Sequence, residues 1–588
     1  MGLLQKAVET YDANSTLVGV YNSDGHEPLA PIGHTLTNAN IEITLDQSGN
    51  FLTARKVDKS EPKILIPITE ESGGRTSTSA KEYPHPLCDK LKYIIADDNY
   101  FIPKLEKWNN SPHSHPFLTP ILSYIKEKSL TADLKKSVGI IKEDDMLCWR
   151  INGFDGEEPA CWKNQNLFQA YIDYYCNLLS ARDAGLCMIS GEVVPIAVQH
   201  PKGIIPINGN AKLISANDSS GFTYRGRFQE DWQAATVGYI ASQKAHNALR
   251  WLASEQGVRE FSGNRIFLCW NPQGIQLPRP MRRFRAVDAE PIRQPSDYRQ
   301  ALHHTLMSYR KDKQLKGTET AVLASFDAAT TGRLSLTYYT EISLDRFLER
   351  MERWDASCCW YNGPYGVQAP NLLQIVECAF GLQRGKILEV DDKIQRQYLQ
   401  RLLDCKVSGG IFPTDILRAL TQRASMPQAY EETIWRRIVF TACSALQKYR
   451  FDTNQGGNEM AWELNRHDRS FQFGRLLAVM ERGEADYYSK TQESRQTNAI
   501  KFMSEYRQRP WFVFERINRQ LHQAYLTRID PWQAKRYERL TGEIVAILGE
   551  FPEEELNKPL EDTYLMGYEL QRNAFFTKKE TDDKETEE

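Results

Sequence analysis

The polar segment at residues 70–77 carries residue types suited to binding phosphate. Two adjacent glycines permit a positive φ and let the backbone approach another molecule closely, which most side chains prevent. The residues after them add a planar cation and two hydroxyls, the donors that hold phosphate oxygens. The candidate phosphate-binding residues are Gly73, Gly74, Arg75, Thr76 and Ser77. An ordinary surface turn is the alternative, and nucleotide hydrolysis has no support because the G-x-x-x-x-G-K-[ST] pattern is absent.

Three asparagines and a lysine form a second candidate, for contacts with base edges. Amide side chains both donate and accept hydrogen bonds, as the edges of bases require. The residues are Asn208, Asn210, Lys212 and Asn217. Asn-Gly is also the commonest tight turn, so a turn without a ligand is the alternative.

Arginines gather in further segments. Residues 279–285 hold four arginines in seven positions with Phe284 among them, and Tyr224 precedes another pair. Arginine beside an aromatic ring suits phosphate contact and base stacking, whereas a solvated loop is the alternative. The candidates here are Arg225, Arg227, Arg282, Arg283 and Arg285. Helices expected in the last third carry Arg466, Arg475 and Arg482, for which a solvated helix face is the favoured interpretation.

A catalytic or metal centre has poor support. His113 and His115 could supply two metal ligands, but prolines flank them and no nearby cysteine or carboxylate completes a known spacing. A surface turn is therefore the favoured interpretation of this pair. The sequence also lacks G-x-S-x-G, H-E-x-x-H and the protein-kinase motifs. The residues by themselves indicate no metal and no cofactor.

Length and composition limit the class of protein. At 588 residues the chain is expected to hold more than one domain, because single cores rarely exceed about 250–300 residues. A net charge of −3 argues against a uniformly basic coat but leaves local basic patches open. The eleven cysteines form no C-x-x-C pair, which predicts reduced thiols and a cytoplasmic setting. No segment approaches the roughly 20 apolar residues of a membrane span.

The elements that must position these residues change in character along the chain. The first part mixes a helix at 2–12, a hairpin at 41–57, a second hairpin at 189–225, a helix at 231–255, a buried strand at 266–270 and a last clear strand at 334–342. From residue 344 the pattern is helical, with a candidate linker at 453–458 and helical stretches near 461–485, 491–507, 510–527, 530–549 and 560–575. The pattern predicts an α+β fold.

Four segments are expected from these changes. They are a mixed α/β domain at 1–343, a helical domain at 344–459, a helical bundle at 460–577 and a disordered tail at 578–588. The tail alternates acidic and basic residues without apolar ones, which is typical of disorder.

Motifs along nearly the whole chain resemble those of one known family. In the first quarter these are Ile64–Pro67, Thr69–Ser72, Gly74–Ser77 and Pro86–Leu91. Further motifs are Cys187–Glu192, Leu213–Asn217, Trp270–Pro272, Gly332–Ser335, Gly474–Glu481 and, most specifically, Gly567–Lys579. They are similar to the large subunit of the type I-C CRISPR surveillance complex, Cascade (the Cas-eight, or Csd-one, family). One segment departs from the family: its small, serine-rich loop appears here as Asn208–Lys212. Motif recognition is therefore expected to use different side chains.

The resemblance implies a DNA-binding role without enzyme activity. Such subunits find the protospacer-adjacent motif on foreign duplex DNA and help to open it, while the guide RNA reads the sequence by base pairing. They also help to hold the displaced strand and recruit a separate helicase-nuclease. The implied partners are the guide RNA, the target DNA, the backbone and handle-binding Cascade subunits, and small subunits.

Residue roles follow from the resemblance as expectations. Asn208, Asn210 and Lys212 would contact the groove, with Asn217 nearby. Lys90 would join residues 73–77 as a phosphate clamp. The arginines at 225, 227, 282, 283 and 285 would follow the duplex or the displaced strand, and those at 466, 475 and 482 would contact the heteroduplex and displaced strand.

The resemblance also implies that the C-terminal bundle is similar to a separate small subunit made from an internal start. Met460 precedes the bundle, and the codons of Gly456 and Gly457 can spell a ribosome-binding GGAGG. A flexible linker turn is the alternative, and both interpretations are compatible. Two other function classes remain open: a metal-dependent nuclease using His113 and His115, and a purely structural scaffold.

Overall fold

The computed structural model describes most of the chain. The described residues are 2–22, 27–76, 79–96, 100–182, 184–205, 210–215, 231–255, 258–259, 265–275, 277–281, 291–315, 319–328, 330, 332–455 and 463–577. The chain divides into two compact units. Unit 1 consists of Met1–Leu277 and Thr320–Ile342, and unit 2 of Pro278–Glu319 and Ser343–Glu588. The boundaries expected at 343, 459 and 577 remain predictions.

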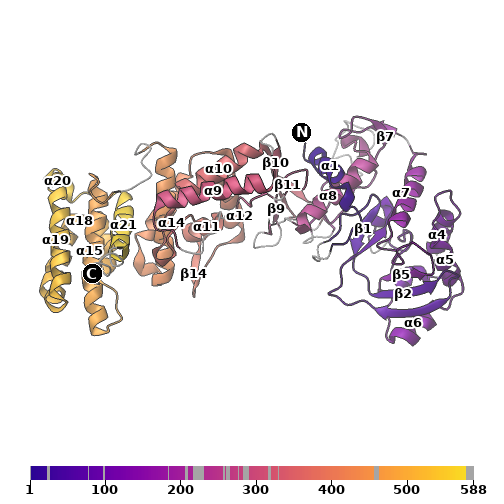
Figure 1. Ribbon diagram of the computed structural model, residues 1–588, viewed down its shortest axis with the longest axis horizontal. Helices are drawn as coiled ribbons and strands as arrows, with labels where there is room; N and C mark the ends of the chain where they lie inside the picture. Colours follow the sequence, from indigo (N-terminus) through magenta and orange to yellow (C-terminus); the bar gives the residue numbers. More distant parts are fainter. Residues whose placement is uncertain are drawn as a thin grey trace. The chain divides into compact units, whose positions relative to one another are not determined.

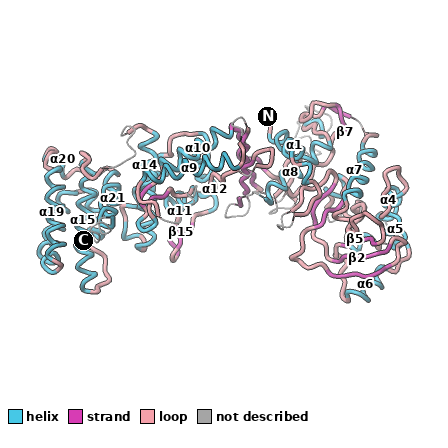
Figure 2. Tube along the Cα trace, viewed as in Figure 1, coloured by secondary structure: helices cyan, strands magenta, loops and turns pink. Residues whose placement is uncertain are grey.

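A three-stranded sheet forms the first part of unit 1. Its central strand β2 (Ile41–Asp46) pairs antiparallel with β3 (Phe51–Lys56) and parallel with β5 (Leu147–Asn152). Figure 2 shows β2 and β5 as neighbouring strands with helices around them. The helices are α4 (Phe101–Asn109), α5 (Leu118–Lys126), α6 (Leu130–Val138) and α7 (Gln165–Leu179). Residues of all four helices share one apolar core with the sheet, so β2 is buried along almost its whole length.

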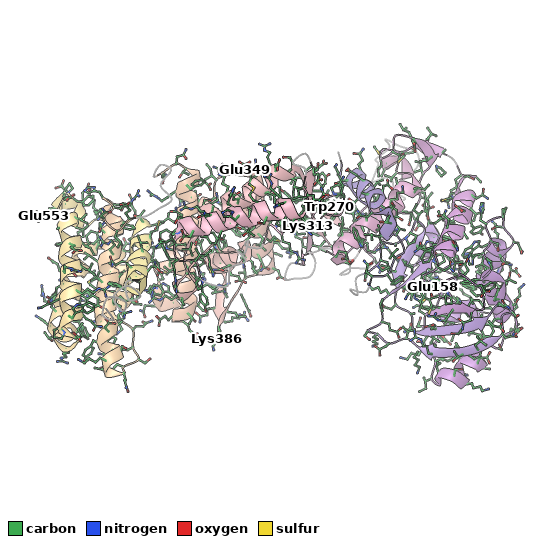
Figure 3. All side chains as sticks on the ribbon, in the orientation of Figure 1. Glu158, Trp270, Lys313, Glu349, Lys386 and Glu553 are labelled. Carbon is green, nitrogen blue, oxygen red and sulfur yellow. The ribbon has the colours of Figure 1, made fainter. Side chains whose placement is uncertain are left out.

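A four-stranded sheet forms the second part of unit 1, in the order β11–β10–β9–β8. Its strands are β8 (Val258–Arg259), β9 (Arg265–Trp270), β10 (Thr320–Asp327) and β11 (Ser335–Ser343). Helices α1 (Leu3–Ala13) and α8 (Tyr239–Glu255) pack together and share its apolar core. Trp270, labelled in Figure 3, is fully buried and donates through Nε1 to Thr10 Oγ1 at 3.0 Å. This core therefore joins the first helix to β9.

A two-stranded ribbon leads into the candidate phosphate segment. Strand β1 (His34–Thr37) pairs antiparallel with β4 (Ile64–Pro67), whose four residues are all buried. Helix α2 (Glu70–Gly74) begins immediately after Thr69, whose Oγ1 accepts from the Ser72 amide at 3.1 Å and caps the turn. The polar segment at residues 70–77 is not expected from the sequence to be helical, but this cap starts a helical turn over Glu70–Gly74. A second short helix, α3 (Leu91–Ile94), follows further along.

Most of the expected elements of unit 1 are confirmed. The helix at 2–12, the hairpin at 41–57 and the strands at 266–270 and 334–342 correspond to α1, β2–β3, β9 and β11. Within the second expected hairpin region, at 189–225, Lys202 and Lys212 form an antiparallel bridge, whereas β7 (Val193–Pro195) pairs with the upstream strand β6 (Ala184–Leu186). Residues 206–209 and 216–225 of that region lie outside the described residues. The turn between β6 and β7 places Gly191 at φ +73°, a conformation that glycine adopts readily. The helix expected from 231 begins at Tyr239, after a 3₁₀ turn at Asp231–Ala234.

Unit 2 is helical with two small hairpins. Its first helices are α9 (Pro295–Asp312), α10 (Leu344–Ser357), α11 (Leu372–Phe380), α12 (Asp392–Ser408), α13 (Thr414–Ala424) and α14 (Glu432–Asp452). The hairpins are β12 (Trp360–Tyr361) with β13 (Val367–Gln368), and β14 (Leu382–Arg384) with β15 (Ile387–Glu389). Residues 334–342 are therefore not the last strand. Among the described residues, no helix combines the length and apolar character needed to cross a membrane.

The C-terminal part of unit 2 is a bundle, as the sequence predicts. Its helices are α15 (Arg469–Thr491), α16 (Asn498–Lys501), α17 (Met503–Gln508), α18 (Pro510–Gln520), α19 (Pro531–Leu548), α20 (Glu553–Leu556) and α21 (Thr563–Thr577). Helices α15 and α21 pack against each other over a long contact, and α19 packs against α15 (Figure 1). The tail at 578–588 lies outside the described residues.

Two glycines allow the backbones of α15 and α21 to touch. A Cβ on Gly474 would overlap the carbonyl oxygen of Tyr564, and one on Gly567 would overlap that of Phe471. Because backbone atoms, unlike long side chains, cannot move aside, only glycine fits at this crossing. Both glycines belong to the motifs that carry the family resemblance.

A buried charge network joins α14 to the bundle. Glu481 on α15 accepts from Arg436 at 2.6 Å and from the Tyr568 hydroxyl at 2.5 Å, and Arg572 lies 3.5 Å away. Arg572 also pairs with Glu569 at 2.8 Å. Two arginines and two glutamates thus neutralise one another, which buried charges require.

Gly474→Ala is expected to destabilise the bundle. The added methyl would force the two helices apart, at a cost of about 3 kcal/mol in the free energy of unfolding. Amide hydrogen exchange of α15 and α21 in the full chain measures the effect as lost protection. The matched control is Gly542→Ala on α19, where a Cβ would meet no atom within 4 Å. That change should stabilise its helix by about 0.5–1 kcal/mol. Equal protection in the two variants would contradict the proposed role of the glycine crossing.

Candidate nucleic-acid interface

Arg75 and Asp89 form a bidentate ion pair that joins the two polar segments of the first quarter. The Nη1–Oδ2 and Nη2–Oδ1 distances are both 2.7 Å, and Arg75 Nη1 also donates to the Tyr83 carbonyl at 2.9 Å. The Asp89 side chain is fully buried and that of Arg75 is 11% exposed. The guanidinium is thus occupied by protein acceptors, and a contact of Arg75 with phosphate remains a prediction.

Asp89 also organises the backbone around it. Its oxygens accept from the amides of His85 at 2.7 Å and Lys90 at 2.8 Å. Burial lowers the pKa of His85 to about 3, so the imidazole is neutral, and its Nδ1 lies 3.0 Å from Ser72 Oγ. This contact connects Asp89 to helix α2. The Lys90 ammonium itself lies at the surface, 2.9 Å from Asp144.

The loop at 203–211 is closed at its base by two lysines. Lys202 and Lys212 face each other in an antiparallel bridge, and the Gly203 amide donates to the Ala211 carbonyl at 3.1 Å. Gly203 has φ +70°, which favours glycine at this turn. Asn210 is exposed on the loop. Asn208 lies outside the described residues.

Three segments far apart in the sequence meet at this base. Lys202 Nζ donates to the Arg75 carbonyl at 3.2 Å, and a Cβ on Gly74 would lie 3.6 Å from Lys212 Nζ. On its other side, the Lys212 amide donates to the Gly332 carbonyl at 3.2 Å, and the Leu334 amide donates to the Lys212 carbonyl at 3.0 Å. The candidate phosphate segment and the candidate base-reading loop are therefore neighbours.

The lysines at this base have little negative charge to balance them. Burial, followed by the charges of Lys212 and Arg75, lowers the pKa of Lys202. Burial likewise lowers the pKa of Lys212, although Glu70 opposes it. The Glu70 carboxylate is already engaged by an ion pair with Arg182 and by the amides of Val198 at 2.9 Å and Gln199 at 3.2 Å.

A cavity of about 670 Å³ adjoins the loop base. It lies among β1, β4, α2, α8 and residues 199–205. Polar side chains that line it include Arg75, His85, Gln199, His200, Lys202, Gln243 and Arg250. Burial lowers the pKa of His200 to about 3, so this imidazole is neutral as well. The cavity therefore combines cations and neutral hydrogen-bonding groups with two carboxylates, Glu27 and Glu70, which are already paired with Lys63 and Arg182.

Arg250 on α8 is a positioning residue that sequence reasoning missed. Its guanidinium donates to the carbonyls of Lys202 at 2.9 Å and Gly203 at 3.2 Å, and to Thr35 Oγ1 at 3.3 Å. These acceptors are neutral, so Arg250 anchors the loop base without losing its positive charge. The sequence signal is an arginine four and three residues after His246 and Asn247, which are buried on the same side of the helix.

The other residues predicted to bind nucleic acid differ in where the structure places them. Arg475 is wrong as an exposed contact, because it is buried and donates to Gln571, to Gln472 and to the Leu464 carbonyl. Its place on α15 turns it toward α21. Arg482 is one-third exposed and pairs with Asp486 at 2.9 Å, and Arg466 is half-buried. Ser77, Asn217, Arg225, Arg227, Arg282, Arg283, Arg285 and Met460 lie outside the described residues.

The histidine pair has no metal-site geometry. His115 is buried, and its Nε2 lies 3.9 Å from Glu157. In the part of the chain that the structure describes, no group of three or more histidine, cysteine, aspartate or glutamate residues is placed to hold a metal ion. Nothing in that part supports the nuclease alternative.

Comparison with known families agrees with the motifs. A family model described as CRISPR-associated protein (Cas_Csd1) matches residues 11–576, so the chain belongs to this family. A search of curated proteins found no match. As a CRISPR-associated protein, the chain works with other components of a CRISPR complex.

Arg75→Ala is expected to destabilise unit 1, whereas Lys90→Ala is not. The first change leaves the buried Asp89 carboxylate without its cation and should lower the free energy of unfolding by about 3 kcal/mol. The second removes only a surface ion pair, worth about 0–1 kcal/mol. Denaturant unfolding of the two variants and the wild type provides the comparison. If both variants unfolded like the wild type, Arg75 would have no structural role.

Proposed function

We propose that this protein is the non-catalytic large subunit of a type I-C Cascade complex. It recognises the protospacer-adjacent motif in foreign double-stranded DNA, assists duplex opening and R-loop stabilisation, and recruits the helicase-nuclease. The family match supports the CRISPR association. The observation that carries the proposal is the meeting of the Lys202–Lys212 bridge with α2 and the segment around Gly332, which brings cations from separate segments together. The protein acts in the cytoplasm and needs no cofactor.

The proposed roles divide between base reading and backbone contact. The loop residues Asn208, Asn210 and Lys212 read base edges, with Asn217 nearby, because amides match the donor and acceptor pattern of bases. The residues proposed for phosphate contact are Gly73, Gly74, Arg75, Thr76, Ser77, Lys90, Arg225, Arg227, Arg282, Arg283 and Arg285. Backbone contacts of this kind fix the register on the duplex but carry no sequence information.

The C-terminal bundle is proposed to hold the heteroduplex and the displaced strand. Arg466 and Arg482 are retained for this role, because both have surface exposure. Arg475 is not, because its guanidinium is bound within the bundle. The partners are the guide RNA, the target DNA, the backbone and handle-binding subunits, small subunits and the helicase-nuclease.

An internal start at Met460 would also yield a small subunit containing this bundle. A strain with Met460→Ile should lose the small product and keep the full chain, because only the second start is removed. Immunoblotting against the C-terminal bundle reads both products. A small product that persists in this strain would contradict the internal start at Met460.

Motif reading is tested with the assembled complex and target duplexes whose flanking bases are randomised. Changing Asn208, Asn210 and Lys212 together to alanine should reduce the preference for particular flanking bases. The difference in binding free energy between the preferred base and the others should fall by about 1–3 kcal/mol at each position that has lost its contact. Lys90→Ala is the comparison: it should weaken all targets alike and reduce the salt dependence of binding by about one phosphate contact.

Two results would contradict the proposal. Unchanged target binding by the triple variant favours a structural scaffold. Cleavage of DNA by the purified chain with Mg²⁺ or Mn²⁺, abolished by His115→Ala, favours a nuclease.

A further inference from the structure

Three cations occupy matching positions on neighbouring segments of unit 1. Lys202 faces Lys212 in an antiparallel bridge, and Lys212 faces Arg333 in a parallel bridge. Residues that face each other across neighbouring strands project their side chains to the same side, with Cβ atoms roughly 5 Å apart. Lys202, Lys212 and Arg333 therefore form one row of cations.

This cation row is unfavourable for the protein by itself. Like charges directly opposite each other on neighbouring strands are destabilising. Among the described residues, none of the three side chains forms an ion pair with a carboxylate: Lys202 donates only to the Arg75 carbonyl. Glu70, whose charge acts on Lys212, is already bound by Arg182 and two backbone amides. An external anion would remove the repulsion within the row.

The cavity lies beside one end of this row. Lys202 lines it together with Gln199. The half-buried side-chain amide of Gln199 lies against Gly74 at the cavity wall. The volume of about 670 Å³ lies within the range of roughly 300–1,000 Å³ that small-molecule sites have. The cavity is therefore large enough for a nucleobase with its sugar.

We propose that the cation row binds the backbone of a single DNA strand and that the adjoining cavity receives one unstacked nucleotide of that strand. Lys202 and Arg333, at the two ends of the row, contact phosphates, and Lys212 between them keeps its proposed base contact. The Gln199 amide contacts the edge of the unstacked base. The inference rests on the proposed function, because the loop closed by Lys202 and Lys212 is the proposed motif reader. It adds Lys202, Arg333 and Gln199, and it assigns a base-binding role to the cavity.

A single strand fits this arrangement better than a duplex. A base inside a duplex is stacked and paired, so it enters a cavity only after leaving the helix, which costs a few kcal/mol. Beside the motif, where the duplex opens, the strands are already unpaired, and this cost is smallest. The DNA strand is favoured over the guide RNA because the motif lies on the DNA.

The experiment uses the assembled complex and target duplexes with 2-aminopurine at successive positions of each strand beside the motif. The fluorescence of 2-aminopurine rises when the base unstacks. One DNA position is expected to brighten more than its neighbours when the complex binds. Lys202→Gln should weaken binding about tenfold and lower the slope of log K against log salt by about 0.7. Motif preference should remain.

Further variants separate the cavity from the cation row. Gln199→Leu should remove the bright position while changing affinity less than twofold. Lys202→Arg should retain both affinity and signal, because the charge remains. The matched control for charge is Lys136→Gln on α6, an exposed lysine that should leave affinity, salt slope and signal unchanged.

The outcomes distinguish this inference from the proposed function. Motif-dependent binding without any bright DNA position would overturn the base-binding cavity and leave the proposed function intact. Binding without motif preference in the wild type would overturn the proposed function itself. A bright position found only when 2-aminopurine is placed in the guide RNA would overturn the choice of DNA. Equal loss of affinity in Lys202→Gln and Lys136→Gln would overturn the role of the cation row.

Discussion

The buried carboxylate of Asp89 is the constraint on which the candidate interface depends. Removing a carboxylate from water is costly, so it must find a cation and further hydrogen-bond donors within the protein. Asp89 finds them in Arg75 and in the amides of His85 and Lys90. Because Arg75 follows α2 directly, this pair fixes where the short helix ends. The end of α2 in turn brings Gly74 against Lys212, so the loop base and the ion pair are parts of one arrangement.

The buried arginines of the bundle and Arg250 at the loop base differ in the charge of their partners. In the bundle, Arg436 and Arg572 meet Glu481 and Glu569, and the buried charges cancel. At the loop base, the anchoring contacts of Arg250 go to carbonyl and hydroxyl oxygens, which leave its charge in place. A chain with a net charge of −3 therefore concentrates positive charge locally. Such concentration attracts polyanions without requiring a basic protein.

Prediction from the sequence succeeded where a pattern is local. Strands β2 and β3 have strict alternation around a turn, and α1 and the bundle helices have apolar residues at helical spacing, so their own residues specify them. It failed where a choice between partners is needed. Strand β7 could pair with a segment upstream or downstream of it in the sequence. It pairs with the upstream strand β6, because a short turn that contains Gly191 joins the two strands. Arg475 has the spacing of an exposed residue, yet the close crossing of α15 and α21 encloses it.

The sequence by itself determined the α+β composition, the helical second half and the motifs that define the family, because these depend on residue type and on near neighbours. It also marked residues 73–77 and 208–212 as separate polar candidates. Only the tertiary structure decided that Gly74, Lys212 and Gly332 lie together, that Arg250 anchors their loop, and that Arg75 is bound by Asp89. These are contacts between residues up to hundreds of positions apart. No local pattern encodes them, since each depends on how the two sheets and α8 pack.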